Sequence, residues 1–465
     1  MTTIHTTSLV RRRPGRGVLA LALCLPIALA GCSSLLDVNN PNSVPIEDIG
    51  DPKTAPSLAN GLLSSLARAW GAVLSPYSIA TDELTWIGSR DAWQYLDQGI
   101  ISEPTNEFVD AAYPFLGESR WLSDTVIKQL TIFLNNTRLE DTNNLARAYL
   151  YGSITYATIG DFFQDFVIGS SKLKPAPPLG PANMDVVYAT AISYATAGLA
   201  LARAASNRDV DLETRLLAAR ARAAHARAVK ALIYPPGAGV PIGGNPLVNN
   251  AAARADAESA LAIAPVADWK FEFHYSPTTV STDIGFEINE RLEMMPGDRY
   301  VNAATWCGDL PATPADITLQ DPIDNIPDPA MLSQIKGRWD CFGDRYTSLT
   351  ALSARELHLI VAEVKLAQGD LPGFDASINN VRSLNGLTNY DHTNPAHPTP
   401  SAILQHERQA NLYLQGRRLQ DEYRFQVPAD IWLAGSEALT VPGTLFPITI
   451  TERLSNTCIV NPSSC

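Results

Sequence analysis

The sequence predicts a mainly α-helical protein whose helices form pairs. Apolar residues recur at helical spacing, as in Leu357, Ile360, Val361 and Val364, which share one face of a single helix. Short turns separate consecutive helical segments, which is typical of stacked helix hairpins, although another bundle of helices would give the same periodicity. Strand patterns do not alternate with helix patterns, so a two-lobed α/β solute-binding protein is not expected.

The helical repeats are expected over about 122–265 and 353–425, with irregular segments over about 75–120 and 266–350 that are rich in Pro, Gly and aromatic residues. In 251–264 the small residues that precede Pro265 are similar to the second helix of a tetratricopeptide repeat. The periodic segments are 56–73, 122–134, 144–163, 184–205, 212–233, 251–264, 353–368, 373–384 and 401–420.

The N-terminus has the pattern of a secretion signal. Arg11, Arg12, Arg13 and Arg16 form a positive region, and the apolar run 18–30 follows it. That run is too short for a bilayer core, which takes about 20 residues. Residues 1–31 are therefore predicted to be a signal peptide, the alternative being a buried N-terminal helix.

The segment Leu29-Ala30-Gly31-Cys32 resembles the bacterial lipobox, in which the cysteine is diacylated and becomes the mature N-terminus. Two or more acyl chains anchor a protein stably. Ser33 follows, not the Asp that commonly retains lipoproteins in the inner membrane, so an outer-membrane destination fits. We expect a lipidated tether over 32–55 and one domain over 56–465, which contacts the membrane through its lipid alone.

The charge of the chain argues against nucleic-acid binding. The formal net charge is −13, and the leader carries four of the arginines and no acid, so the mature chain is more acidic still. An acidic protein repels nucleic acid and anionic lipid, and no basic stripe with interleaved aromatic residues occurs.

Four cysteines remain beyond the leader and the lipobox: Cys307, Cys341, Cys458 and Cys465. An even number in an oxidising compartment favours disulfides. Proximity in the sequence predicts the pairs Cys307–Cys341 and Cys458–Cys465. A zinc site is the weaker alternative, because no pair has CxxC spacing.

Motifs that would indicate catalysis or a bound cofactor are absent from the sequence, which has no HExxH, GxSxG or P-loop. His392 and His397 lie in a Pro-rich loop and are interpreted as solvated rather than as metal ligands. The acids of 321–329 lack EF-hand spacing. A glycosidase pair of carboxylates within 82–91 remains an alternative, since the sequence cannot give their separation. No catalytic residue, cofactor or metal is predicted.

Aromatic residues in the irregular segments are the better indication of a ligand site. A flat ring can cover the apolar face of a sugar while neighbouring polar groups bind its hydroxyls. The alternative for each residue is that it fills the gap between loops and helices. The candidates are Trp86, Trp93, Tyr95, Tyr300 and Trp306.

A series of motifs in the last third of the chain resembles the C-terminal pattern of the SusD/RagB family. Their order and spacing match over Ala362-Glu363, Gly369-Asp370, Ile378-Asn379, Val381-Arg382, Gly386-Leu387, Glu407-Arg408, Gly416, Arg417-Arg418, Asp421, Arg424 and Phe446-Pro447-Ile448. Upstream, Arg147-Ala148-Tyr149 and Gly160-Asp161-Phe162 resemble another family helix. Asn411 and Thr449 depart from the pattern, where the family usually has Glu and Pro.

The resemblance implies a stack of tetratricopeptide-like helix pairs carrying a loop-rich ligand-binding region. It further implies a cell-surface lipoprotein that binds an oligosaccharide or peptide and passes it to a SusC-like TonB-dependent barrel without breaking a bond. The charged tail residues are interpreted as structural, with Arg417 and Asp421 as an i, i+4 pair and Glu407 and Arg418 on one helix face. The alternatives are a lipid-anchored scaffold without a small ligand and a helical surface glycosidase.

Overall fold

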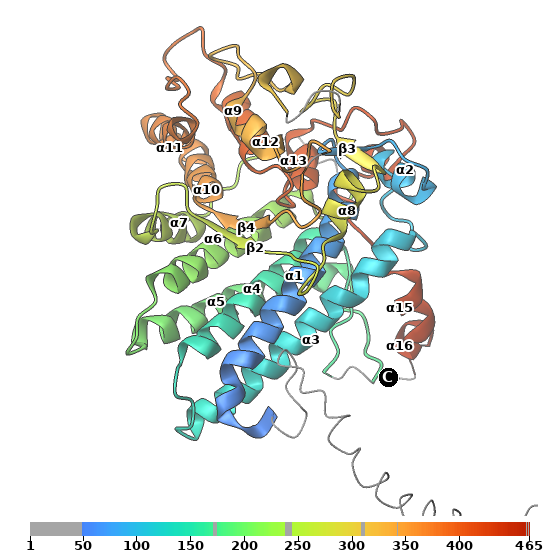
Figure 1. Cartoon of the computed structure of the whole chain (residues 1–465), viewed down its shortest axis with the longest axis vertical. Helices are drawn as coiled ribbons and strands as arrows, with labels where there is room; N and C mark the ends of the chain where they lie inside the picture. Colours follow the sequence, from blue (N-terminus) through green and yellow to red (C-terminus); the bar gives the residue numbers. More distant parts are fainter. Residues whose placement is uncertain are drawn as a thin grey trace, which may run out of the picture. The chain divides into compact units, whose positions relative to one another are not determined.

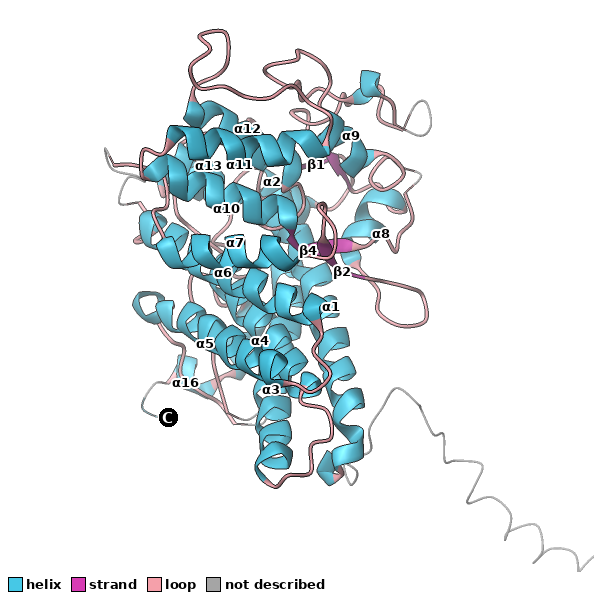
Figure 2. Ribbon diagram, turned by 90° about the vertical axis from the view of Figure 1, so that its left-hand side faces the viewer, coloured by secondary structure: helices cyan, strands magenta, loops and turns pink. Residues whose placement is uncertain are grey.

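The computed structural model describes residues 49–170, 174–237, 244–307, 312–341, 343–461, 463 and 465. These residues belong to one compact unit, Ile46–Cys465. The predicted signal peptide, the lipidation site Cys32 and most of the tether lie outside the described residues. The predicted mainly α class is confirmed, because helices dominate the described part and the strands are few and short (Figure 2).

The helices stack as consecutive neighbours, as the paired periodicity predicts. α1 packs on α3, and each following helix in turn contacts the one before it, with α7 bridging to α10 (Figures 1 and 2). The stack consists of α1 (Ala55–Ile79), α3 (Glu107–Asn135), α4 (Asn143–Phe162), α5 (Asp185–Ala204), α6 (Val210–Ile233), α7 (Ala251–Ile263), α10 (Ala354–Ala367) and α11 (Leu371–Leu384).

Small residues allow close packing within this stack. The alanines that the sequence singled out in α7, Ala253, Ala257 and Ala260, are all fully buried. At Gly160 in α4, a Cβ would lie 2.6 Å from Cζ of Tyr188. The missing side chain lets the Tyr188 hydroxyl reach the neighbouring Asp161, to which it donates a hydrogen bond of 2.9 Å.

The loop-rich half contains two small antiparallel sheets among short helices, in the upper part of Figure 1. β1 (Leu84–Trp86) pairs with β3 (Met294–Pro296), and β2 (Lys270–Phe273) pairs with β4 (Leu349–Ser353). The short helices are α2 (Asp91–Asp97), α8 (Asp283–Asn289), α9 (Pro329–Ile335), α12 (Pro400–Asn411), α13 (Arg418–Phe425) and α14 (Glu437–Thr440), with 3₁₀ turns at Pro52–Thr54, Pro181–Asn183 and Pro314–Asp316.

The segment 75–120 is more helical than the sequence predicts. α1 continues through Pro76 to Ile79, α2 follows, and α3 begins at Glu107 and contains Pro114. A proline removes one helix hydrogen bond, but burial of residues such as Tyr77 and Tyr113 beside each proline offsets that loss.

The helix predicted over 401–420 is in fact two helices. α12 ends at Asn411 and α13 begins at Arg418, with Leu414 and Gly416 in the left-handed region at φ 53° and 70°. The Leu414 N–H donates to Glu83 Oε1 at 2.8 Å instead of to a helix carbonyl. A buried contact to the turn after α1 therefore interrupts the helix.

Both disulfides join the cysteines that proximity predicts. Cys307 pairs with Cys341 and Cys458 pairs with Cys465, each with Cα atoms 5.4 Å apart. The second disulfide links α16 (Thr457–Val460) to the last residue of the C-terminal segment, in which α15 (Ile450–Ser455) precedes the closed loop. This segment docks on the body because the Ile450 N–H donates to the carbonyl of Pro104 at 2.8 Å.

Candidate functional site

Two of the five candidate aromatic residues belong to the core. Trp93 is 2% exposed and stacks on Phe108, with ring centroids 3.4 Å apart. Tyr300 is 0% exposed, and its hydroxyl donates to Asp82 Oδ1 at 2.9 Å. Neither ring is accessible to a ligand in this structure, so the gap-filling alternative is correct for both residues.

The other three candidates differ in exposure. Trp306 is half-buried, packs against the core and donates its indole N–H to the Trp339 carbonyl at 2.9 Å. Trp86, at the end of β1, is also half-buried against the core. Tyr95 on α2 is 46% exposed, so it is the most exposed of the five candidates.

A segment that the sequence did not single out lies beside α2. The Leu433 N–H donates to the Gln98 carbonyl at 3.1 Å, which fixes the segment 427–436 against the end of α2. Ile431 and Leu433 are 43% and 48% exposed, comparable to Ile87 and Tyr95. We call Thr85–Ile87, Tyr95, Asp298–Arg299 and Asp430–Leu433 the loop face. Its apolar run Ile431-Trp432-Leu433 is visible in the sequence, but the run alone does not indicate that this segment lies beside α2.

The loop face contains a small pocket of about 100 Å³ with a mixed polar and apolar lining. Three carboxylates and a hydroxyl lie among apolar groups, a combination that suits a hydroxyl-bearing ligand group. The lining residues are Asp82, Leu84, Thr85, Gly297, Asp298, Asp430 and Ile431.

The carboxyl of Asp97, beneath the loop face, has a raised pKa. Burial raises the pKa of Asp97 to about 7, even though its Oδ2 accepts hydrogen bonds from the Trp86 N–H and the Thr85 hydroxyl. Asp97 thus connects α2 to β1, and its charge changes near neutral pH.

Buried ion pairs hold the loop face on the helical body. Arg418 of α13 binds Asp82 through Nε and Nη2, at 2.7 and 2.5 Å, and Arg299 binds the same carboxylate at 2.9 Å. Burial opposes ionisation, but the two arginines hold the pKa of Asp82 below its ordinary value. The carboxylate is committed to these contacts, so it supports the pocket without being free to act as an acid.

The charged residues of the tail form a buried structural network, as the sequence interpretation holds, but with different partners. Arg417 binds Glu356 of α10 at 2.5 Å, and Asp421 binds Arg408 at 2.7 Å and Arg424 at 2.8 Å. The predicted pairing of Arg417 with Asp421 is therefore wrong. The expected shared face of Glu407 and Arg418 is also wrong, since the two residues lie on separate helices.

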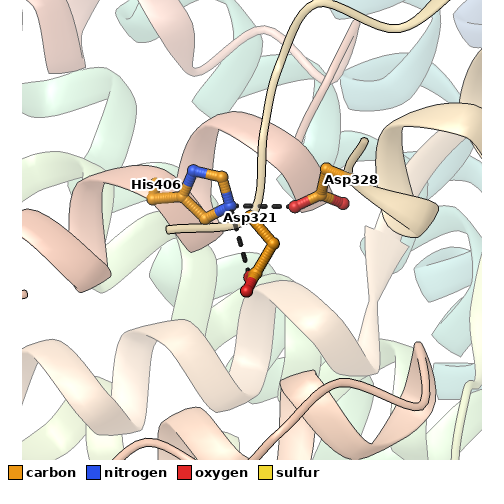
Figure 3. Close-up of side chains that lie close together, drawn as sticks. All are labelled: Asp321, Asp328 and His406. Atoms are coloured by element: carbon orange, nitrogen blue, oxygen red, sulfur yellow. Dashed lines mark hydrogen bonds and ion pairs between the residues drawn. The ribbon is translucent and has the colours of Figure 1, made fainter. Parts of the chain in front are cut away.

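A cluster of Asp321, Asp328 and His406 has the residue types of a metal site (Figure 3). His406 Nε2 lies 2.8 Å from Asp328 Oδ2 and 3.9 Å from Asp321 Oδ2. Arg382 binds both oxygens of Asp321, at 2.7 and 3.1 Å. Burial lowers the pKa of His406, but the hydrogen bond to Asp328 and the nearby carboxylates, Glu407, Asp328 and Asp321, together raise it overall. The Arg382 guanidinium and the His406 imidazole already bind these acids, so we interpret the cluster as a polar network of the protein itself.

The two histidines of the Pro-rich loop make local hydrogen bonds. His392 Nδ1 lies 2.6 Å from Asp375 Oδ2, and His397 Nδ1 accepts from the Asp391 N–H at 3.0 Å. The first contact ties the loop to α11 and the second ties it to itself, and His392, Asp375 and Asp391 together have the residue types of a metal site.

Solved structures resemble this chain over most of its length. A SusD superfamily protein from Bacteroides fragilis matches with a TM-score of 0.59 at 10% identity, covering 88% of this chain and 99% of the other. A SusD homolog from Bacteroides thetaiotaomicron matches with a TM-score of 0.58 at 13% identity, covering 89% and 98%. A SusD superfamily protein from Bacteroides vulgatus gives 0.57 at 12% identity, covering 88% and 98%.

No protein-family model and no curated protein matches the sequence. The similarity is thus one of fold: the order of helices, the loop-rich half and the coverage agree, although few residues are identical. By the architecture of its described residues and these structural matches, the chain has the SusD-like fold.

Proposed function

We propose that this protein is a surface lipoprotein that captures a glycan or peptide nutrient and delivers it to a SusC-like TonB-dependent barrel in the outer membrane. The observation that carries the proposal is the SusD-like fold over almost the whole chain. The lipobox at Cys32 and the tail motifs support it independently, since neither was needed to recognise the fold.

The loop face is the proposed site of capture. Ile87, Tyr95 and Leu433 are exposed side chains of three separate segments of the loop face, and the pocket of that face has carboxylates and Ile431 in its lining. Rings and aliphatic groups can cover the apolar faces of a sugar or a peptide side chain, while the acids bind hydroxyl or amide donors.

Ligand binding explains the carboxylates of the loop-face pocket better than glycoside hydrolysis does. Asp82 is held ionised by Arg418 and Arg299, so it is not available to donate a proton. A glycosidase needs one carboxyl that donates a proton and a second that acts as nucleophile or base. The glycosidase alternative predicts hydrolysis that disappears when Asp298 or Asp430 is replaced by Asn.

A glycan and peptide array tests the capture site with two matched variants. Tyr95→Ala and Leu433→Ala remove exposed side chains of the loop face, whereas Val266→Ala removes an exposed side chain elsewhere (61% exposed). The proposal expects that the first two variants lose the signal of the wild-type ligand and that Val266→Ala keeps it. An array on which the wild type binds nothing would favour the scaffold alternative. Equal binding by the wild type and all variants would show that the ligand is not captured by the loop face.

Labelling with a radioactive or clickable fatty acid tests the anchor. The wild type should take up the label and fractionate with outer membranes, and Cys32→Ser should not. A labelled Cys32→Ser protein would show that another residue is modified, and an unlabelled wild type would show that the leader is not a lipoprotein signal.

A further inference from the structure

A second pocket lies away from the loop face, between α3 and the C-terminal residues 449–456, which precede the Cys458–Cys465 disulfide. Its volume is about 520 Å³, within the range of roughly 300–1,000 Å³ that is usual for small-molecule sites. α15 lies to the right of α3 in Figure 1, and the third wall consists of Phe166, Val167, Gly169 and 174–176. The pocket shares no lining residue with the loop-face pocket among the described residues.

The lining provides buried hydrogen-bond donors. Thr449 is 1% exposed, and its hydroxyl has no hydrogen-bond partner among the described residues. Arg120 is 5% exposed; its Nη1 donates to the Gly169 carbonyl at 2.7 Å, while its Nε is without a partner in the same described part. Buried polar atoms are rarely left unpaired, so a ligand acceptor in this pocket would satisfy both groups.

Charges in the pocket balance one another. Among the described residues, the lining contains two bases, Arg120 and Lys174, and two acids, Glu118 and Glu452. Arg120 is in addition paired with Asp124, which lies outside the lining, at 3.2 Å. Burial raises the pKa of the Tyr113 hydroxyl, which therefore stays neutral and accepts a hydrogen bond from the Val167 N–H at 3.1 Å. A lining with no excess of either sign favours an uncharged ligand.

A glycine keeps the floor of the pocket open. Gly117 lies inside α3, where glycine costs about 0.5–1 kcal/mol relative to alanine. No heavy atom of the described residues lies within 4 Å of a Cβ built there, so no close packing requires the glycine. Its position in the lining means that a side chain at 117 would extend into the pocket instead.

We infer that this pocket binds an uncharged, hydroxyl-bearing ligand of the size of a saccharide unit, at a site separate from the loop face. Thr449 and Arg120 donate to ligand oxygens, and the Trp121 indole contributes apolar wall. The segment before the C-terminal disulfide, for which the proposed function gives no role, supplies one side of the site through Thr449, Thr451 and Glu452.

Saturation-transfer NMR with maltose, cellobiose, lactose and mannobiose as probes tests the inference. Gly117→Leu should fill the pocket, and Thr449→Val should remove the buried hydroxyl without changing the shape of the side chain. Gly61→Leu is the matched control, because Gly61 is also a helical glycine with no heavy atom of the described residues within 4 Å of its Cβ position, but it lies in α1 outside the pocket. Tyr95→Ala reports on the loop face.

We expect saturation transfer from the wild-type protein to at least one disaccharide. Gly117→Leu and Thr449→Val should each reduce this signal at least tenfold, whereas Gly61→Leu and Tyr95→Ala should retain it. Melting temperatures no lower than that of the wild type would show that the variants are folded. Transfer that is insensitive to Gly117→Leu, or no transfer to any probe, would overturn the inference. Transfer lost only in Tyr95→Ala would also overturn it, while leaving capture by the loop face intact.

Discussion

Arg418 of α13 and Asp82, in the turn after α1, form a bidentate ion pair with N–O distances of 2.7 and 2.5 Å although they are 336 residues apart in the chain. The pair is nearly buried, with side-chain exposures of 10% and 1%. It joins the tail of the protein to the base of the loop face. The loop face therefore depends on a contact that forms only when the two ends of the fold meet.

Replacing Arg418 with Met should lower the free energy of unfolding by about 3–5 kcal/mol, because Asp82 would keep a buried charge with one arginine fewer. Urea denaturation measures the change. Arg227→Met is the control, since the Arg227–Asp185 pair is 43% and 59% exposed and should contribute less than about 1 kcal/mol. Equal effects of the two substitutions would contradict the structural role of the buried pair.

Trp93 and Tyr95 should respond in opposite ways to truncation, although they are neighbours on α2. Trp93→Ala removes a buried ring stacked on Phe108 and should cost about 3–5 kcal/mol of stability. Tyr95→Ala removes an exposed ring and should stay within about 0.5 kcal/mol of the wild type. Thermal or chemical unfolding distinguishes the two, and a large loss from Tyr95→Ala would mean that its ring is packed.

Stability should depend on pH through Asp97. Its pKa is about 7 in the folded protein, above its ordinary value, so the folded state binds the proton more tightly than the unfolded state. The resulting stabilisation is complete below about pH 4 and is lost as the pH rises through 7.

Asp97→Asn should therefore be more stable than the wild type above pH 7, by at least about 1 kcal/mol, and similar to it near pH 4. Urea midpoints measured at several pH values follow the difference. A constant difference between variant and wild type at all pH values would show that Asp97 does not titrate in this range.

The two disulfides should contribute unequally to stability. Cys307 and Cys341 are 34 residues apart, whereas Cys458 and Cys465 are 7 apart. Loop-closure entropy predicts losses of about 4 and about 2 kcal/mol when each pair is replaced by serines. Calorimetry of the two double variants provides the comparison, and a larger loss from the shorter loop would mean that docking of the C-terminal segment dominates.

The helices of the stack could be predicted from the sequence, because the apolar periodicity that marks each helix lies within the helix itself. Periodicity placed α4, α5, α6 and α7 within a few residues of their observed ends. The break between α12 and α13 could not be predicted, since it depends on a hydrogen bond from Leu414 to Glu83, 331 residues away. Periodicity within 401–420 continues across that break, so the sequence alone favours one helix.

The candidate site was predicted in part. The segment 75–120 does contain an exposed aromatic residue, but of its three candidates only Tyr95 belongs to the exposed class. A helix over 91–97 would have placed Trp93 and Leu96 on its inner face and Tyr95 on the outer one. The contribution of 427–436 could not be foreseen, because a tertiary contact brings that segment to α2.

Affinity capture from detergent-solubilised outer membranes, with the lipidated full-length protein as bait, tests the central claim most directly. The proposed delivery role predicts recovery of a TonB-dependent β-barrel, and Arg418→Met, which weakens the base of the loop face, should recover less of it than Arg227→Met does. Recovery of no membrane protein, or of an inner-membrane permease, would contradict delivery to a barrel and favour the scaffold or importer alternatives.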